Sequence, residues 1–277
     1  MRGTRAELEQ KLGSGTGKAI RGICISGHTV SLLPVDAAGT PLRRAMIWMD
    51  SRSDSELTWL LEQIGRERFC SIVGAQPSPS FLPGKLLWFR KNEPELMNKT
   101  ACLLQANSFI TSRLTGRFTI DLDQAAKSQC LDVSHGQWSR EIGEAIGVEL
   151  DQLLPPPQSP QTIAGTVTRQ AAEQTGLAEG TPVLTGCSDA VAAIWAMGLS
   201  RLGEAGESVG TTSLVFAGAD RPSATTGPVV SHPFRPGTIP YLFDAPISTS
   251  GAAVEWFLKN LAGERLLQCR NAGGDVY

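Results

Sequence analysis

The chain has 277 residues, a formal net charge of -2, 41% hydrophobic residues and 19% charged residues. This composition is ordinary for a globular protein, and the length is enough for one large domain or two smaller ones with a well-buried core. A charge so close to zero gives no support for a protein that binds nucleic acid or an anionic membrane.

The cysteines and the N-terminal segment bear on the cellular compartment. Six cysteines are scattered without a C-x-x-C pair, and the charged start of the chain has no apolar core of a signal peptide. This pattern predicts reduced thiols. The apolar stretch Ala190–Leu199 is too short to span a bilayer, and the three histidines are far apart, which disfavours a zinc site. We expect a soluble, cytoplasmic protein.

The first half of the chain alternates apolar runs with helical patterns. Local signals for helix starts, helix ends and hairpin turns fix most of these elements. The predicted elements are a helix over 5–12, a buried strand Ile20–Ser26, a hairpin of Val30–Val35 with Leu42–Trp48, a helix capped by Ser53 or Asp54 with Leu57, Leu60, Leu61 and Ile64 on one face, a helix opened by Pro83 and stopped near Pro94, and a helix Asn107–Leu114 capped by Gly116.

The second half continues the alternation after a loop at the Pro-Pro-Pro run 155–157. Alternating strands and helices predict an α/β fold, and we find no internal repeat. The predicted elements are a strand Ile163–Val167, a helix that begins after Thr168 and ends at Gly176, a strand Pro182–Thr185, a helix Asp189–Met197, two strands around Ser208–Val209 and Thr212–Phe216, and a helix Ala252–Leu261.

Asp189 is the strongest chemical candidate. A strand runs through a small-residue turn, Gly-Cys-Ser-Asp, into a helix, so Asp189 lies at or beside the helix N-terminus. Free amides and the helix dipole there favour an ionised carboxylate, which suits a group that accepts a proton from a hydroxyl. The same pattern also fits a residue that only caps the helix.

Two further groups fit the same chemistry. Gly210, Thr211 and Thr212, with Ser213, form a turn between two apolar strands, which offers amides and hydroxyls to a phosphate or is an ordinary β-turn. The second group lies at the end of the predicted strand Leu42–Trp48. If that strand continues, alternate positions put an aromatic ring, a carboxylate and a guanidinium on one face, which suits a polyol. The alternative is an edge salt bridge beside a core tryptophan. These three residues are Trp48, Asp50 and Arg52.

The segment Gly-Ser-Gly-Thr-Gly-Lys-Ala at 13–19 resembles a Walker loop only superficially. Its spacing is one residue short, and Ala19 stands where Ser or Thr would hold magnesium. The segment also precedes a strand, whereas a P-loop follows one. We interpret it as a helix-to-strand connection.

Taken in order, the segments resemble the FGGY carbohydrate kinases, a family that includes xylulokinases, ribulokinases and glycerol kinases. The specificity of the resemblance comes from the ordered series across nearly the whole chain. The matching pieces are GICISGH (22–28), IWMDSR (47–52), GKLLWFRKNEPE (84–95), NSFITSRLTGRF (107–118), LDVSHGQWS (131–139), GCSDAVAA (186–193), SVGTTSLV (208–215) and STSGAAVEWF (248–257).

The resemblance implies an actin-like ATPase or ribonuclease-H-like fold, with sugar bound mainly by a first domain and ATP by a second. It implies residues 1–202 as the sugar-binding domain and 203–277 as the start of the nucleotide-binding domain. The implied activity is ATP-dependent phosphoryl transfer to a sugar or polyol, with a pentulose favoured, Mg²⁺ as a cofactor and a homodimer as a candidate assembly. The implied site residues are Asp189 as the base, His28, Thr29, Trp48, Asp50 and Arg52 at the sugar, and Gly210, Thr211 and Thr212 at the phosphates.

The sequence also departs from the family pattern. The D-x-G-T phosphate loop that opens family members has no counterpart at the start of the chain, and the adenosine pocket would lie beyond Tyr277. Asn107 replaces an Asp, and SGHTVS at 26–31 replaces S-G-Q-M-H-G, so the sugar contacts differ. We therefore expect little kinase activity from the isolated chain and exposed apolar surface near Val254, Trp256 and Phe257. A non-catalytic sugar-binding or partner-binding remnant, and a fragment of an active kinase, stay open as alternatives.

Overall fold

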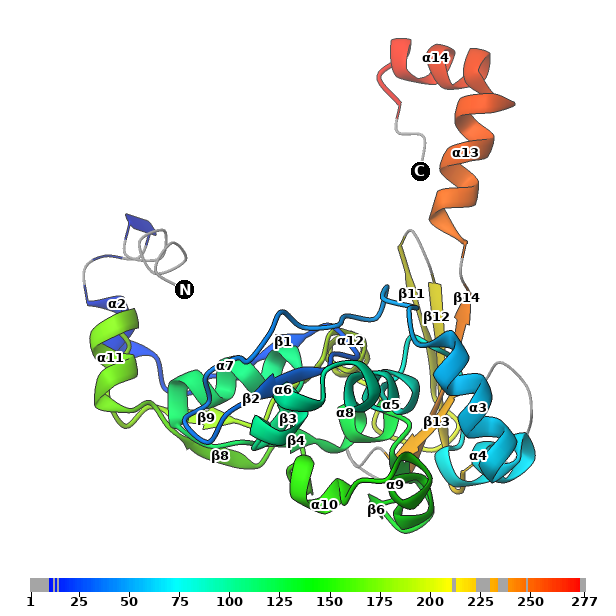
Figure 1. The fold of residues 1–277 in the computed structure, drawn as a ribbon. Coiled ribbons are helices and arrows are strands. Elements are labelled where there is room, and N and C mark those ends of the chain that lie inside the picture. The colour runs from blue at the N-terminus through cyan, green and yellow to red at the C-terminus, as the bar shows by residue number, and fades with distance from the viewer. Residues whose placement is uncertain are drawn as a thin grey trace.

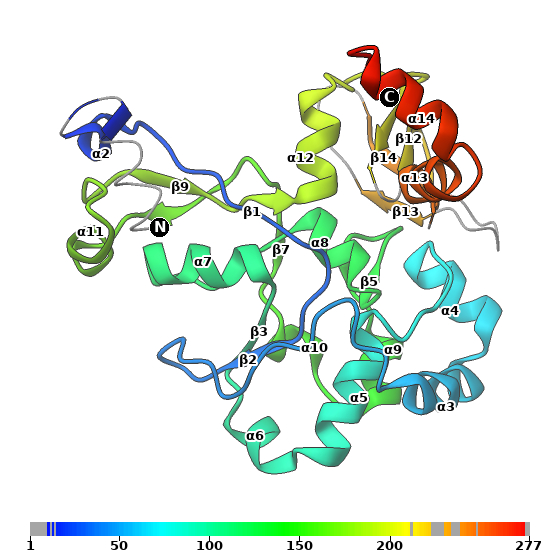
Figure 2. The same ribbon diagram turned by 90° about the horizontal axis from the view of Figure 1, so that it is seen from above.

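The structure is a computed structural model that describes residues 10–11, 13, 15–210, 213–222, 230–233, 239–247 and 249–274. Short strands and helices of the first 200 residues form one body, and a four-stranded sheet stands against one side of it (Figure 1). Two C-terminal helices, α13 (Gly251–Asn260) and α14 (Gly263–Asn271), project away from both (Figure 1). Seen from above, α12 (Asp189–Ala196) lies between the sheet and the strands of the first body (Figure 2).

Helices supply most of the core of the first body. Its interior is a continuous cluster of buried apolar side chains, which includes Phe69, Leu86 and Phe89. Packing of α3 against α5 and α9 closes this cluster. The helices that contribute are α3 (Asp54–Ile64), α4 (Arg66–Val73), α5 (Leu82–Asn92), α6 (Pro94–Lys99), α8 (Leu122–Lys127), α9 (Arg140–Ile146) and α10 (Leu150–Leu153).

The strands of the first body are short and pair two by two. β1 (Ser26–Gly27) runs parallel to β10 (Cys187–Ser188), and β4 (Ile120–Asp121) runs parallel to β7 (Pro157–Gln158). The antiparallel pairs are β2 (Leu33–Val35) with β3 (Cys102–Leu104), β5 (Leu131–Asp132) with β6 (Gln137–Trp138), and β8 (Ile163–Thr166) with β9 (Pro182–Leu184).

A second core forms where α12 meets the four-stranded sheet. The strand order is β11-β12-β14-β13, all antiparallel. Val191 and Ile194 of α12 are fully buried against Phe216 and Leu242 of the sheet. The strands are β11 (Ala205–Val209), β12 (Ser213–Ala219), β13 (Val230–Pro233) and β14 (Tyr241–Ile247).

Most elements expected from the sequence are confirmed. The helix α7 (Ala106–Thr115) ends at Gly116 in the left-handed conformation. The helix α11 (Arg169–Thr175) is capped by the Thr168 hydroxyl and closed by Gly176. The expected hairpin is present as backbone contacts between Leu32 and Met46. The expected helix over 5–12 lies largely outside the described residues.

Two expectations need correction. The strand expected at Ile20–Ser26 is shorter, with a bridge at Ile23 and regular pairing only in β1. The glycine-rich connection contains one helical turn, α2 (Thr16–Ala19), which α11 contacts through the close approach of Gly17 to the Gly176 carbonyl. No helix among the residues described has the length and apolar character needed to cross a membrane.

Gly27 marks the closest approach between β1 and α7. A Cβ atom at this position would lie 2.9 Å from the backbone nitrogen of Asn107. We expect Gly27→Ala to lower the free energy of unfolding by about 1–3 kcal/mol, the usual cost of overpacking. Urea denaturation would measure the change.

Gly22→Ala is the matched control for this substitution. Gly22 precedes the same strand, and a Cβ there would meet no atom within 4 Å. Equal stability of the Gly27→Ala and Gly22→Ala proteins would contradict the packing that we describe between β1 and α7.

Candidate functional site

Asp189 lies where the sequence predicts, at the end of a strand and the start of a helix. β10 ends at Ser188, and Asp189 is the first residue of α12. Its side chain is exposed, and its Oδ1 accepts a hydrogen bond from the amide of Ala190 at 2.8 Å. The carboxylate is therefore accessible from solvent in the first turn of a helix whose dipole favours negative charge.

The capping residue of α12 is Ser188. Its side-chain Oγ accepts a hydrogen bond from the amide of Val191 at 3.3 Å, which is the standard capping contact. The N-cap residue is therefore Ser188 and not Asp189, which corrects the interpretation of Asp189 as the cap. The Asp189 carboxylate contacts the amide of Ala190 and stays exposed.

His28 lies beside Asp189 because of strand register. In the parallel pair β1–β10, Gly27 is the partner of Ser188, so His28 and Asp189 are the residues that directly follow the two paired strands. Parallel strands leave their carboxyl ends at one edge, which is where ligands bind in open α/β folds. The ring Nε2 of His28 lies 3.1 Å from Ser31 Oγ, and its carbonyl accepts from Gln124 Nε2 at 3.2 Å. Thr29 follows His28 and is half-buried.

A cluster of buried polar residues packs behind this strand edge. Asp121 is fully buried, caps α8 by accepting from the Gln124 amide at 2.9 Å, and accepts from Asn107 Nδ2 at 3.0 Å. Asn107 Nδ2 also lies 3.5 Å from the Cys187 carbonyl in β10. Burial, with a smaller effect from the charge of Asp123, raises the pKa of Asp121 to about 7.

The segment with Trp48, Asp50 and Arg52 is a turn, which corrects the premise that a strand continues through it. The amide of Asp50 donates to the Ile47 carbonyl at 2.9 Å, and strand pairing stops at Met46. Alternate positions therefore do not place the three side chains on one strand face. Arg52 Nε pairs with Asp50 Oδ1 at 2.9 Å, while Trp48 is 51% exposed and so is no core residue.

Lys85 of α5 holds this turn, and we did not predict it from the sequence. The lysine is fully buried, and its Nζ donates to the carbonyls of Ile47 at 2.6 Å and Ser80 at 2.5 Å. Burial lowers the pKa of Lys85 to about 8, and the charge of Asp50 acts in the opposite direction. Partial burial acts to raise the pKa of Asp50, but hydrogen bonds from Arg52 outweigh it and leave that pKa below its ordinary value.

Gly210, after β11, and Ser213, the first residue of β12, lie against the start of α13. The Gly210 carbonyl accepts from the Gly251 amide at 3.0 Å, and the hydroxyls of Ser213 and Ser250 are 2.7 Å apart. The N-cap residue of α13, Ser250, makes no side-chain capping hydrogen bond, and its carbonyl accepts from the amides of Ala253 and Val254. The predicted phosphate-loop residues Thr211 and Thr212 lie outside the described residues.

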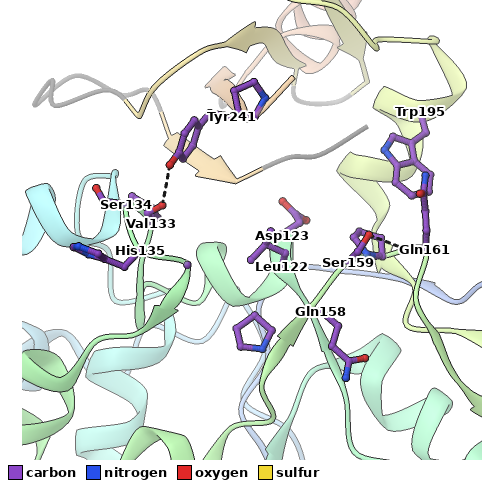
Figure 3. A pocket seen from close by; sticks show the side chains of 14 residues that line it. Leu122, Asp123, Val133, Ser134, His135, Gln158, Ser159, Gln161, Trp195 and Tyr241 are labelled. Atoms are coloured by element: carbon purple, nitrogen blue, oxygen red, sulfur yellow. Dashed lines mark hydrogen bonds between the residues drawn. The ribbon is translucent and has the colours of Figure 1, made fainter. Parts of the chain in front are cut away.

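A cavity of about 270 Å³ opens at the junction of the first body and the sheet. Figure 3 shows Asp123 of α8, Trp195 of α12 and Tyr241 of β14 on its walls. Neither Asp189 nor the predicted sugar-binding residues belong to its lining. Within the described part of the chain, no three His, Cys, Asp or Glu side chains are grouped so as to hold a metal ion.

The match to a known family decides the assignment. Residues 3–196 match the model described as the FGGY family of carbohydrate kinases, N-terminal domain. The chain belongs to the FGGY family. The family resemblance inferred from the ordered motifs is thus confirmed.

Individual FGGY proteins are similar over much of this chain. The chain is 27% identical to a xylulose kinase of Bacillus subtilis (strain 168) over 91% of its own length and 51% of that protein. It is 31% identical to a xylulose kinase of Streptomyces rubiginosus over 75% of its length and 43% of that protein. The chain therefore spans about half the length of the curated relatives that it matches.

A solved FGGY structure shares the fold. The crystal structure of a xylulose kinase from Rhodospirillum rubrum superposes with a TM-score of 0.85 at 24% identity, over 95% of this chain and 53% of that one. The predicted α/β class with the actin-like, ribonuclease-H-like fold is confirmed by this similarity.

The raised pKa of Asp121 makes a testable contribution to stability. Between its unfolded value of 3.8 and about 7, the folded protein keeps a proton that the unfolded chain releases. The stability from the protonated form is complete below that range and is lost as the pH rises through about 7. We expect the free energy of unfolding of the wild type, relative to Asp121→Asn, to fall as the pH rises across this window.

Asparagine suits position 121 because, among the described residues, Asn107 Oδ1 is buried without a hydrogen-bond partner. A rotated Asn107 amide would accept from the new side chain. Urea denaturation at several pH values would measure the difference, with the exposed Asp151→Asn as control. Parallel pH profiles for wild type and Asp121→Asn would contradict the raised pKa.

Proposed function

We propose that the protein takes part in ATP-dependent phosphoryl transfer to a hydroxyl of a sugar, with Asp189 as the general base. The observation that carries this proposal is that two different residues at the start of α12 supply the helix cap and the exposed carboxylate. Ser188 caps the helix, and the carboxylate of Asp189 stays exposed beside His28 at the edge of two parallel strands. Membership of a carbohydrate kinase family and xylulose kinase relatives favour a pentulose such as xylulose as the acceptor.

In phosphoryl transfer the protein mainly positions the reactants and stabilises charge, and it takes little part in covalent chemistry. The acceptor hydroxyl must lose its proton as it attacks, and a carboxylate within hydrogen-bond reach takes that proton. The first turn of a helix suits this role, because the helix dipole stabilises negative charge there.

The sugar-binding residues follow from the same edge. His28 and Thr29, after β1, would present hydrogen-bonding groups beside Asp189. The exposed ring of Trp48 would cover the C–H face of a sugar, and the Asp50–Arg52 pair would bind hydroxyls. Lys85 contributes indirectly, because it fixes the turn that carries them.

The phosphates of ATP would meet Gly210, Thr211 and Thr212 beside the start of α13, where the hydroxyls of Ser213 and Ser250 also lie. These groups are neutral donors, so they would orient the phosphates, while Mg²⁺ bound to the nucleotide would supply charge compensation. We further propose residues 1–202 as the sugar-binding domain and 203–277 as part of the nucleotide-binding domain, with a homodimer as the assembly to test. A sugar-binding protein without turnover is the alternative function.

Replacement of Asp189 tests the assignment of the base. In an intact parent enzyme, we expect Asp189→Asn to lower sugar-stimulated ADP release by roughly 10²–10⁴-fold, the usual contribution of a general base, because the amide cannot accept the proton. A coupled ADP-release assay with xylulose, other pentuloses and glycerol would measure it.

Asp151→Asn is the control, because Asp151 is an exposed carboxylate in the first turn of another helix, α10. Turnover by Asp189→Asn equal to that of the control would remove Asp189 from catalysis. Sugar binding by calorimetry without any ADP release by the wild type would favour the non-catalytic alternative.

Asp50 tests the sugar site separately. We expect Asp50→Asn to weaken sugar binding by about 1.5–3 kcal/mol, the value of a hydrogen bond to a charged group, with little effect on ATP affinity. Isothermal titration with xylulose would measure the affinity. The control is Asp132→Asn, which removes a half-buried carboxylate that pairs with His135 instead. Unchanged sugar affinity in Asp50→Asn would exclude this turn from the site.

A further inference from the structure

A line of buried polar groups connects the start of α12 with the four-stranded sheet. The hydroxyl of Ser188 donates a short hydrogen bond to Asp123 Oδ2 in α8. Lys127 Nζ lies 3.2 Å from Asp123 Oδ1 and 3.3 Å from Asp244 Oδ2 in β14. All four residues are at least nine-tenths buried. The contacts therefore run from the residue before Asp189, through α8, to the middle of the sheet.

The hydroxyl of Ser188 makes two contacts that fix its orientation. It donates its only hydrogen to Asp123 and accepts from the Val191 amide of α12 at 3.3 Å. Hydrogen bonds to an ionised acceptor are shorter and about twice as strong as neutral ones. Asp123 therefore selects the Ser188 rotamer that caps α12, and the position of the next residue, Asp189, depends on it.

Lys127 makes the burial of Asp123 tolerable. A buried carboxylate without a partner is costly, and removal of one member of a buried ion pair leaves the other uncompensated. Burial alone would lower the pKa of Lys127, but the charges of Asp123 and Asp244 outweigh it and raise that pKa. Lys127 therefore stays a cation between two carboxylates, one from each side of the junction.

The buried polar groups constrain α12 in a way that its apolar contacts do not. Val191 and Ile194 already anchor α12 on the sheet through apolar packing, which fixes the helix against Phe216 and Leu242. Apolar packing is not directional, whereas hydrogen bonds constrain the geometry of a helix start. Figure 3 shows Asp123 extending from α8 toward the sheet, beside the contact from the Tyr241 hydroxyl to the Val133 carbonyl at 3.5 Å.

We propose that Asp123 and Lys127 are positioning residues for Asp189, which hold the start of α12 in register with both α8 and β14. The inference rests on the proposed function, because it concerns the geometry of the proposed base. Neither residue is proposed to touch the substrate. A shift of the sheet relative to α8 would reach Asp189 through Asp244, Lys127, Asp123 and Ser188 in turn.

Amide hydrogen exchange of α12 gives a readout that does not depend on activity. Asp123→Asn keeps the side-chain shape but removes the charge that Ser188 and Lys127 contact. We expect exchange at residues 190–194 to become about five- to tenfold faster, the size of effect that follows from a weakened helix cap. Lys127→Met should have the same local effect, although Lys127 does not contact α12 through any hydrogen bond described here.

Three further variants control for simple loss of stability. Lys127→Arg retains a cation between the two carboxylates and should restore slow exchange. The double variant Lys127→Met with Asp244→Asn keeps the net charge, so it tests the loss of the tie if Lys127→Met alone fails to fold. Arg140→Met removes an exposed ion pair with Glu144 of the same i,i+4 spacing and should leave α12 unchanged.

Steady-state kinetics provide the second readout. Because a misplacement of about 1 Å can cost roughly 10²-fold in rate, we expect Asp123→Asn to lower kcat by about 10- to 100-fold. The KM for the sugar should change by less than about twofold, since Asp189 is a reacting group and not the main source of sugar affinity. Lys127→Arg should recover kcat.

The outcomes separate this inference from the proposed function. If the intact parent enzyme with the wild-type sequence shows no phosphoryl transfer, the proposed function fails, and the exchange experiment still tests the positioning. If Asp189→Asn loses activity but α12 exchanges at the wild-type rate in Asp123→Asn and Lys127→Met, the inference fails alone. Faster exchange spread evenly over the whole protein would also overturn it, because that result means general destabilisation.

Discussion

The cost of burying carboxylates inside the first body organises this site. Asp121 and Asp123 lie within the first turn around α8, and both are removed from water. Such groups are costly to bury unless hydrogen bonds or an opposite charge compensate them. The donors come from α7 through Asn107, from β10 through Ser188, and from α8 itself through Lys127. The elements around Asp189 are therefore held together by the requirements of two acidic side chains that solvent does not reach.

Different groups compensate the burial of these two carboxylates. Asp123 has a cation beside it and a hydroxyl donor, which keep a charged form compatible with burial. Asp121 receives donors from Asn107 and the Gln124 amide, and its raised pKa shows that these donors do not offset burial and the adjacent charge. The charge of one carboxylate thus favours the neutral form of its neighbour. Lys127 pairs with Asp123, whereas Asp121 receives its hydrogen bonds from neutral donors.

The sequence predicted the elements whose signals are local. The helix that begins after Thr168 and ends at Gly176 is one example, and the helix that Pro83 opens is another. Capping hydroxyls, left-handed glycines and first-turn prolines act within a few residues, so one sequence contains all of the information. The strand–turn–helix at Asp189 was predicted for the same reason.

The sequence did not predict what depends on distant contacts. Helix α8 was missed because its buried face carries Asp123, Gln124 and Lys127, so no apolar periodicity marks it. An Asp–Lys pair at i,i+4 is usually an exposed surface pair. Only the arrival of Asp244 from β14 makes it a buried network. The alternation of residue types over 48–52 favours a continued strand, but the pairing with the neighbouring strand ends at Met46.

The start of α12 shows how a structure can identify the capping residue where the sequence allows two. A Ser-Asp dipeptide before an apolar helix allows either residue to be the cap, and both are favoured at that position. The register of β10 with β1 decides, because it leaves Ser188 as the last strand residue and turns its hydroxyl inward to Asp123. The inward hydroxyl then caps the helix, and the next side chain must point outward. An exposed Asp189 is thus a consequence of a buried Asp123, and the location of the proposed base follows from a residue that never reaches the surface.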